Sequence, residues 1–289
     1  MRRGEDVKKA AVIVSILFAA LVVFAPHIMK AVSVITAEDV TTNVEENNNE
    51  SVRVALKEGD FLYFGSYLEE PLLWQVLDVT DEGKILMMTR HVITFKAFDA
   101  SGAAQGYHEA DSALYGSSSW KTSSLKQWLN SDDDKVSYSH SAPEKNYVSQ
   151  GYNSYAEEKG FLHGDNFSEE LVRLIDGSGV FILSKEQISS YFSTGERLKT
   201  PTKSALEQSE SPYFGYDSME VWYWTSSPVS SNNVSVATVT SSGGYYKTLA
   251  FDGLTGVAPA VYLRSRNVIC GGGDGSKEHP YFVRGGETA

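Results

Sequence analysis

The chain has 289 residues, of which 42% are hydrophobic and 12% aromatic, so it is long enough to bury a substantial core. Its formal charge at pH 7 is −12, and no basic stripe offsets this excess of carboxylates. That balance excludes nucleic acid as an expected partner, because clustered lysine and arginine carry most of the affinity for phosphate. Cys270 is the one cysteine, which excludes an internal disulfide and a metal site built from several cysteines.

Residues 1–37 predict a signal peptide or a membrane anchor. A short basic and polar stretch precedes an apolar run over residues 10–25, which Pro26 ends. That run lies between a signal-peptide core and a full span of about 20 residues. Extended through Ala37, it is long enough for a tilted span with Lys30 at the interface. The basic flank predicts that the N-terminus stays inside.

Two fates of this segment stay open. If the segment is retained, residues 10–30 contact the membrane and the domain is extracytoplasmic; if it is cleaved, the protein is secreted. Residues 31–33 and 35–37 offer the small side chains that a signal peptidase needs. Residues 38–56 are acidic and asparagine-rich and predict a flexible linker. We expect a single extracytoplasmic domain over residues 57–289.

The first part of that domain predicts an antiparallel meander. Residues 60–67, 72–79 and 84–89 are rich in β-forming side chains, and turn signals separate them. Three short helices follow, at 123–130, 167–175 and 185–192; serines at 123 or 124 and at 168 are expected caps for the first two. A buried strand at residues 180–183 lies between the second and third helices.

The last third of the chain predicts short strands joined by tight turns. Residues 222–225 form one strand, residues 234–240 and 245–251 form a hairpin about Gly243, and residues 257–263 form the last core strand. Sheet, helices and a second small sheet together indicate an α+β fold.

The order and spacing of several motifs resemble an uncharacterised family, a domain of unknown function found in exported proteins of Gram-positive bacteria. The resemblance covers roughly residues 57–266. The motifs that carry it are Gly59-Asp60, Phe64-Gly65-x-Tyr67, Trp74-x-Val76-Leu77, Trp120, Ser124-Leu125-x-x-Trp128-Leu129-Asn130, Phe181-Ile-Leu-Ser184, Pro201-Thr202, Trp222-Tyr-Trp-Thr-Ser-Ser-Pro228 and Gly256-Val-Ala-Pro-Ala260.

The second half also looks like C-type-lectin-like folds, which implies a ligand-binding scaffold with antiparallel sheets and short helices, preceded here by one N-terminal hydrophobic helix. The chain departs from the family pattern at two positions. The family often has arginine near Ser226 and at Ala258, and neither residue is basic here. Any family site that uses those arginines is therefore not transferred to this chain.

No convincing catalytic centre is present in the sequence. Two Ser-x-x-Lys matches, at Ser118 and Ser123, have the order of penicillin-binding enzymes, but Leu249 replaces the glycine of the last element. The carboxylates at 132–134 are read as a solvated helix end, and His163-x-Asp165 as a surface loop. No metal or cofactor is expected; calcium is an open alternative near Asp217, Glu220, Asn232 and Asn233.

Aromatic residues give the best indication of function. By alternation, Trp222 and Trp224 share one face of their strand and are expected in the core, which turns Tyr223 the other way. Exposed tyrosine beside asparagine and serine suits sugar stacking or protein contact. The predicted ligand-binding residues are Tyr213, Tyr216, Tyr223, Asn232, Asn233, Tyr245 and Tyr246.

The sequence thus predicts a surface-displayed or secreted binding module that recognises glycan or protein without catalysis. Two alternatives stay open: an extracytoplasmic hydrolase or transferase acting on the cell envelope, and a structural component of a membrane-associated complex.

Overall fold

The computed structural model describes residues 51–99, 115–139, 155, 158–209, 219–231 and 233–284. They belong to a compact unit that spans Glu50–Ala289. The predicted N-terminal hydrophobic helix and the linker up to residue 50 lie outside the described residues. Among the helices that the structure does describe, none has the length and apolar character needed to cross a membrane.

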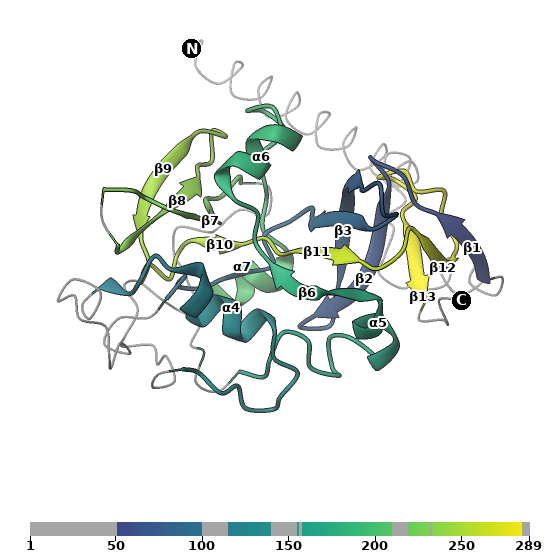
Figure 1. Ribbon diagram of the computed structural model, residues 1–289, viewed down its shortest axis with the longest axis horizontal. Helices are drawn as coiled ribbons and strands as arrows, with labels where there is room; N and C mark the ends of the chain where they lie inside the picture. Colours follow the sequence, from purple (N-terminus) through teal and green to yellow (C-terminus); the bar gives the residue numbers. More distant parts are fainter. Residues whose placement is uncertain are drawn as a thin grey trace, which may run out of the picture. The chain divides into compact units, whose positions relative to one another are not determined.

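The described residues form two sheets, which Figure 1 shows with β10 and β11 running from one towards the other. The larger sheet has the order β1-β12-β13-β2-β3-β4-β11-β6. The predicted meander is confirmed as β2, β3 and β4. The strands are β1 (Ser51–Ala55), β2 (Phe61–Tyr67), β3 (Glu70–Val79), β4 (Ile85–Thr89), β6 (Ile175–Phe181), β11 (Ala260–Leu263), β12 (Asn267–Gly271) and β13 (Tyr281–Arg284).

The smaller sheet has the order β5-β10-β7-β8-β9. Its strands are β5 (Thr94–Phe95), β7 (Tyr223–Pro228), β8 (Ser235–Val239), β9 (Tyr245–Leu249) and β10 (Gly256–Val257). The predicted hairpin is confirmed as β8 and β9. Gly243 occupies the left-handed region in its turn, with φ +80°, and a Cβ there would lie 1.9 Å from the Thr194 carbonyl oxygen. Glycine at this turn therefore satisfies both a backbone and a packing requirement.

Short helices cover the sheets. They are the 3-10 helix η1 (Trp120–Thr122) and the α-helices α4 (Ser124–Leu129), α5 (Glu169–Leu174), α6 (Lys185–Tyr191) and α7 (Lys203–Ser209). The three predicted helices are present, and Ser123 and Ser168 cap α4 and α5 as expected. α7 was not predicted, because its seven residues bury only Ala205 and Ser209 and so carry a weak periodic pattern.

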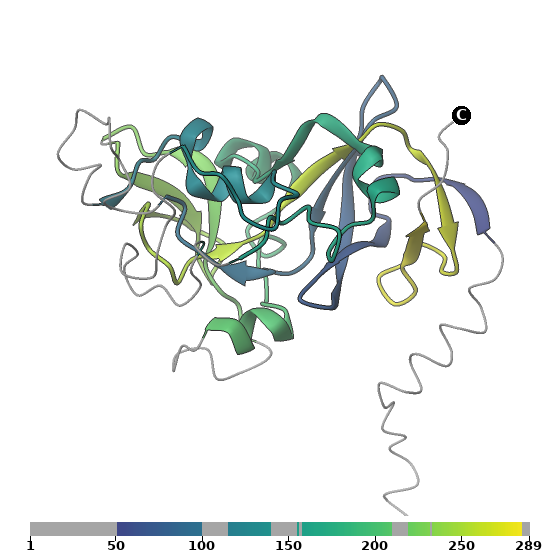
Figure 2. The ribbon, with the colours of Figure 1, turned by 90° about the horizontal axis from the view of Figure 1, so that it is seen from below.

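Two hydrophobic cores lie on opposite faces of the central strands. Along β4, Ile85 and Met87 join the larger core, whereas Leu86 and Met88 join the second. Figure 2 shows α4 and α5 on one side of the sheets and α7 on the other. In agreement, Leu125 and Trp128 of α4 belong to the larger core, while Ala205 of α7 belongs to the second. Strands buried on both faces are therefore a main feature of this fold.

The prediction of an α+β, C-type-lectin-like fold is wrong. The described part of the chain is mostly β, and its helices have three to seven residues. The last core segment is not one strand, because Pro259 interrupts it and cannot donate a ladder hydrogen bond. Residues before Pro259 form β10 in the smaller sheet, and residues after it form β11 between β4 and β6. The two halves of the domain interleave instead of stacking in sequence order.

Candidate functional site

The predicted ligand-binding tyrosines have different environments. Tyr213, Tyr216 and Asn232 lie outside the described residues. Tyr223 does turn away from Trp224 as alternation requires, but the side it faces is the second core, where it is fully buried. Its hydroxyl donates to the Arg197 carbonyl at 2.9 Å. A ring in this position offers no surface to a ligand.

Tyr245 and Asn233 are tied into the fold. The Tyr245 hydroxyl donates to the Lys185 carbonyl at 3.0 Å and lies 2.8 Å from the Ser189 hydroxyl. The Lys185 ammonium and the Arg197 guanidinium lie 5.1 and 4.9 Å from the Tyr245 ring centre. The carbonyl of Asn233 accepts a hydrogen bond from the Ser118 backbone at 2.7 Å.

Trp222 and Tyr246 form an exposed aromatic pair, which we call the ring pair. Trp222 is 38% exposed and Tyr246 57% exposed, and their ring centres lie 5.5 Å apart with a 60° angle between planes. Strand alternation predicts Trp222 in the core, and this prediction is wrong. Trp222 lies just before β7 begins, so the alternation that buries Trp224 within the strand does not extend to it. The two rings present apolar area with polar edges to solvent.

A second candidate is a cleft of about 520 Å³ beside the β2–β3 turn, lined by residues 67–69, 158–159, 163 and 165–166. We call it the turn cleft. Its volume falls within the range of small-ligand sites. Leu68 and Glu69 make the two-residue turn with φ of 51° and 64°. Both are in the left-handed region, where non-glycine residues cost roughly 1–2 kcal/mol each. Leu68 is also one of the exposed large apolar side chains, at 45%.

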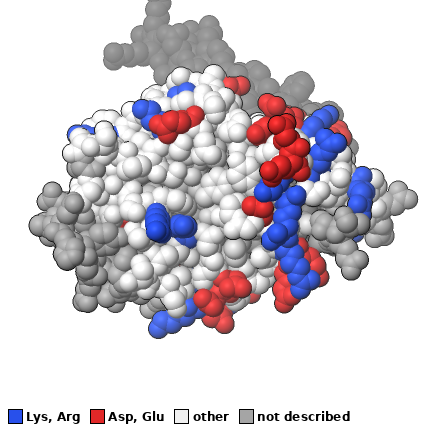
Figure 3. Space-filling model, in the orientation of Figure 1, with Lys and Arg blue, Asp and Glu red and all other residues white. Residues whose placement is uncertain are grey.

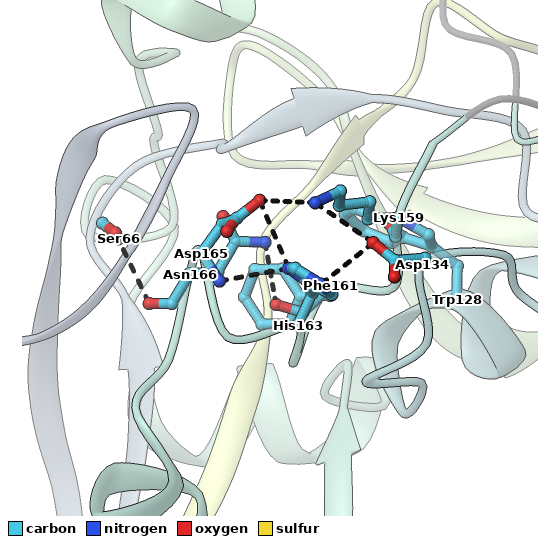
Figure 4. A network of polar contacts seen from close by, with 8 residues as sticks. All are labelled: Ser66, Trp128, Asp134, Lys159, Phe161, His163, Asp165 and Asn166. Carbon is cyan, nitrogen blue, oxygen red and sulfur yellow. Dashed lines mark hydrogen bonds and ion pairs between the residues drawn. The ribbon is translucent and has the colours of Figure 1, made fainter.

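Three residues that line the turn cleft, Lys159, His163 and Asp165, form a ring of polar contacts with Asp134 beside the cleft (Figure 4). Lys159 Nζ lies 2.8 Å from Asp165 Oδ2 and 3.2 Å from Asp134 Oδ1. His163 lies between the same two aspartates, with Nε2 3.3 Å from Asp134 Oδ1. The Asp165 backbone N–H donates to His163 Nδ1 at 3.1 Å, so in the neutral imidazole the proton is on Nε2 and faces Asp134. The Lys159 ammonium holds the pKa of Asp165 below its usual value.

The floor of the turn cleft holds a paired carboxylate. Glu158 accepts from the Tyr67 hydroxyl and forms an ion pair with Lys96, whose side chain is fully buried. The Lys96 ammonium lies 4.9 Å from the Trp128 ring centre and 4.7 Å from the Tyr155 ring centre. Burial, together with the charge of Glu158, raises the pKa of Tyr67 well above its usual value, so its hydroxyl stays a donor to the carboxylate.

Backbone bonds hold the wall of the turn cleft against α4. Phe161 N–H donates to the Trp128 carbonyl at 3.0 Å, and the Trp128 indole donates to the Lys159 carbonyl at 3.0 Å. On the other side, Ser66 N–H donates to the Asn166 carbonyl at 2.8 Å. Gly160 fits because a Cβ there would lie 2.1 Å from the Ser131 carbonyl oxygen. The polar groups of the turn cleft are thus held in place before any ligand arrives.

Local patterns predict a surface loop at His163-x-Asp165 and a solvated helix end at residues 132–134. The structure brings Asp134, His163 and Asp165 together through contacts between distant segments, for which a single sequence carries no spacing signal. Within the part of the chain that is described, no three or more His, Cys, Asp or Glu side chains could hold a metal ion. Ser123, from one Ser-x-x-Lys match, accepts from Lys126 N–H as the cap of α4.

Lys199 is a buried lysine that contacts residues from two smaller pockets. One has a volume of about 380 Å³ and is lined in part by Arg90, and the other has about 130 Å³ and is lined in part by Thr89. Lys199 donates to the carbonyls of Thr89 and Arg90, each of which lines one of these pockets. Burial, with a smaller effect of Arg90, lowers the pKa of Lys199 to about 7. No carboxylate within the described ranges forms an ion pair with it.

Comparison with known proteins identifies the family. No curated protein and no solved structure matches the chain. Residues 82–265 match the family described as Domain of unknown function (DUF6273), which is more than half of the chain. The match includes the ring pair and the rim of the turn cleft, but it begins after the β2–β3 turn. It agrees with the resemblance to a domain of unknown function, and the chain belongs to the DUF6273 family.

Proposed function

We propose that this protein is an extracytoplasmic binding module that recognises glycans without catalysis. In this proposal, residues 10–30 hold the protein at the membrane, or the module is secreted after cleavage, as expected for an exported protein of a Gram-positive bacterium. The observation that carries the proposal is the ring pair. Few large aromatic side chains of the described residues are exposed, and two of those few, Trp222 and Tyr246, lie side by side.

Two properties of the surface support a neutral ligand. On the face in Figure 3, charged side chains gather mainly in one band of mixed sign, and a broad area carries no charge. Adjacent aromatic faces suit the C–H face of a sugar ring, because they bury apolar area while the indole N–H and phenol O–H stay available for hydrogen bonds.

A glycan array with the full chain tests the proposal. Because the full chain includes the apolar segment at residues 10–25, the protein is kept in a detergent. This detergent should lack a sugar headgroup, so that it does not compete with glycans for the site. We expect Trp222→Ala and Tyr246→Ala each to weaken glycan binding by about tenfold or more, since each removes one ring of the pair. Leu249→Ala is the matched control, because Leu249 is an exposed apolar residue of the same strand as Tyr246 but not part of the ring pair.

A protein ligand would use the same rings differently, because exposed tryptophan and tyrosine are also common anchors of protein interfaces. The array separates the two classes of ligand. If no glycan binds, and Trp222→Ala leaves the recovery of partners in a pull-down unchanged, the ring pair is not a binding surface and the proposal is wrong.

A further inference from the structure

The turn cleft has features that the ring pair does not explain. It combines a volume of about 520 Å³, a turn of two non-glycine residues in the left-handed region, and a carboxylate paired with a fully buried ammonium. Strained backbone persists only where the surrounding structure enforces it, and it is concentrated at functional sites. Here the strain places the apolar side chain of Leu68 at the rim of a polar cleft.

Three of the four carboxylates at the turn cleft, Glu158, Asp134 and Asp165, already contact an ammonium group. Glu158 is neutralised by Lys96, and Lys159 lies between Asp134 and Asp165. A cationic ligand would have to compete with these ammonium groups for the carboxylates. An anionic ligand would face Glu69, Glu158 and Asp165 together, which repel it. Neither kind of ion matches the site well.

Hydroxyl groups match it better, because each can both donate and accept. An ionised carboxylate offers about four acceptor positions. In its described contacts, Glu158 accepts one hydrogen bond on each oxygen, from Tyr67 and from Lys96. Further lone pairs of the same oxygens are left for ligand donors. Lys159 is 45% exposed in its side chain and supplies a donor at the rim.

We propose that the turn cleft binds a neutral sugar residue, with ring hydroxyls on Glu158 and Asp165 and the C–H face of the ring against Leu68. This inference rests on the proposed glycan-binding function and names a second site and a ligand class for it. The wall that carries Lys159, His163 and Asp165 is fixed to α4, so binding requires little reordering of the protein.

Leu68→Gly is the most informative variant. Glycine adopts the left-handed region without strain and removes the apolar contact, so we expect the melting temperature to rise while sugar binding falls. A residue with a purely structural role would not change the two quantities in opposite directions. Asp165→Asn removes one acceptor, and we expect it to weaken binding by about tenfold. The matched controls are Val52→Ala, an exposed apolar residue of β1, and Asp132→Asn, an exposed aspartate outside the ring of charges.

The measurement is a titration of the full chain, in detergent without a sugar headgroup, followed by calorimetry and by saturation transfer in nuclear magnetic resonance. The probes are glucose, galactose, mannose and N-acetylglucosamine, with glucosamine and glucuronate as charged analogues. We expect saturable binding of at least one neutral sugar, weakened by both cleft variants and unchanged in both controls. Binding of glucosamine or glucuronate alone, binding that survives both cleft variants, or no binding by any probe would overturn the inference.

The variants distinguish failure of this inference from failure of the proposed function. If Trp222→Ala and Tyr246→Ala abolish glycan binding while the cleft variants do not, the proposed function holds and this inference is wrong. If the cleft variants abolish binding and the ring-pair variants do not, the turn cleft is the sugar site and the ring pair does not bind glycan.

Discussion

Lys199 is a buried lysine whose surroundings disfavour the charged form of its amine. Its side chain contacts two backbone carbonyls and lies 5.8 Å from the Tyr223 ring centre. Burial lowers its pKa from an ordinary value of 10.5 to about 7. Between these two values, the unfolded chain binds a proton that the folded chain does not bind. The free energy of unfolding contributed by Lys199 therefore rises with pH across this window and is lowest below pH 7.

Lys199→Met should stabilise the protein at pH 7, by an amount on the order of 4 kcal/mol, because it removes the cost of burying this charge. The variant should also lack the rise in stability that the unmodified protein shows above about pH 7. Denaturant titrations from pH 6 to about pH 9.5 measure both effects, below the range in which tyrosine titrates. Lys203→Met, an exposed lysine of α7, is the control. An unchanged pH profile in Lys199→Met would show that Lys199 keeps its ordinary pKa.

At the scale of single elements, α6 begins with a complete capping box. The Ser184 hydroxyl accepts from Gln187 N–H, and the Gln187 side chain accepts from Ser184 N–H. Both bonds satisfy backbone donors that a helix of seven residues could not otherwise pair. Because α6 covers the second core through Ile188, its start position matters for that core.

Ser184→Ala should lower the free energy of unfolding by about 1 kcal/mol, through loss of the cap. Ser190→Ala is the control within the same helix, because Ser190 only donates back to the Gln187 carbonyl and alanine favours the helix. Chemical denaturation of both variants measures the difference. Equal stabilities would mean that packing of Ile188, and not the capping box, determines where α6 starts.

At the scale of the whole molecule, strands from distant parts of the chain alternate within one sheet. β1 pairs with β12, and β13 lies between β12 and β2. β11 lies in this larger sheet between β4 and β6, although β10, which precedes it in the chain, lies in the smaller sheet. No block of consecutive strands can therefore detach without breaking pairing elsewhere, which favours a single cooperative transition for residues 51–284.

Cys270 reports on that transition. It is buried in β12, and burial, with a smaller effect of Asp60, raises the pKa of its thiol to about 12. We expect a thiol reagent to label Cys270 along the same denaturant curve as the loss of far-ultraviolet circular dichroism. Labelling at lower denaturant concentration than the loss of circular dichroism would show that β1, β12 and β13 unfold as a separate unit.

Local patterns predicted many elements well. The meander β2–β4, the caps of α4 and α5, and the β8–β9 hairpin depend on side-chain alternation, serine caps and a turn glycine, which act over a few residues. β1, β12 and β13 escaped prediction because their pairing partners lie at opposite ends of the domain. The exposure of Tyr223 and Trp222 was also not predicted, because alternation predicts which side of a strand a residue faces but not what covers that side.

By itself, the sequence determined the acidic character of the chain, the lone cysteine, most of its short elements and its likeness to a domain of unknown function, because these follow from composition and near-neighbour patterns. Only the tertiary structure decided that the fold is mostly β, that Trp222 and Tyr246 remain exposed together, and that Asp134, Lys159, His163 and Asp165 form one ring of polar contacts beside the turn cleft. Those facts depend on which distant segments pack together, and packing energy is a property of the assembled core and not of any local stretch.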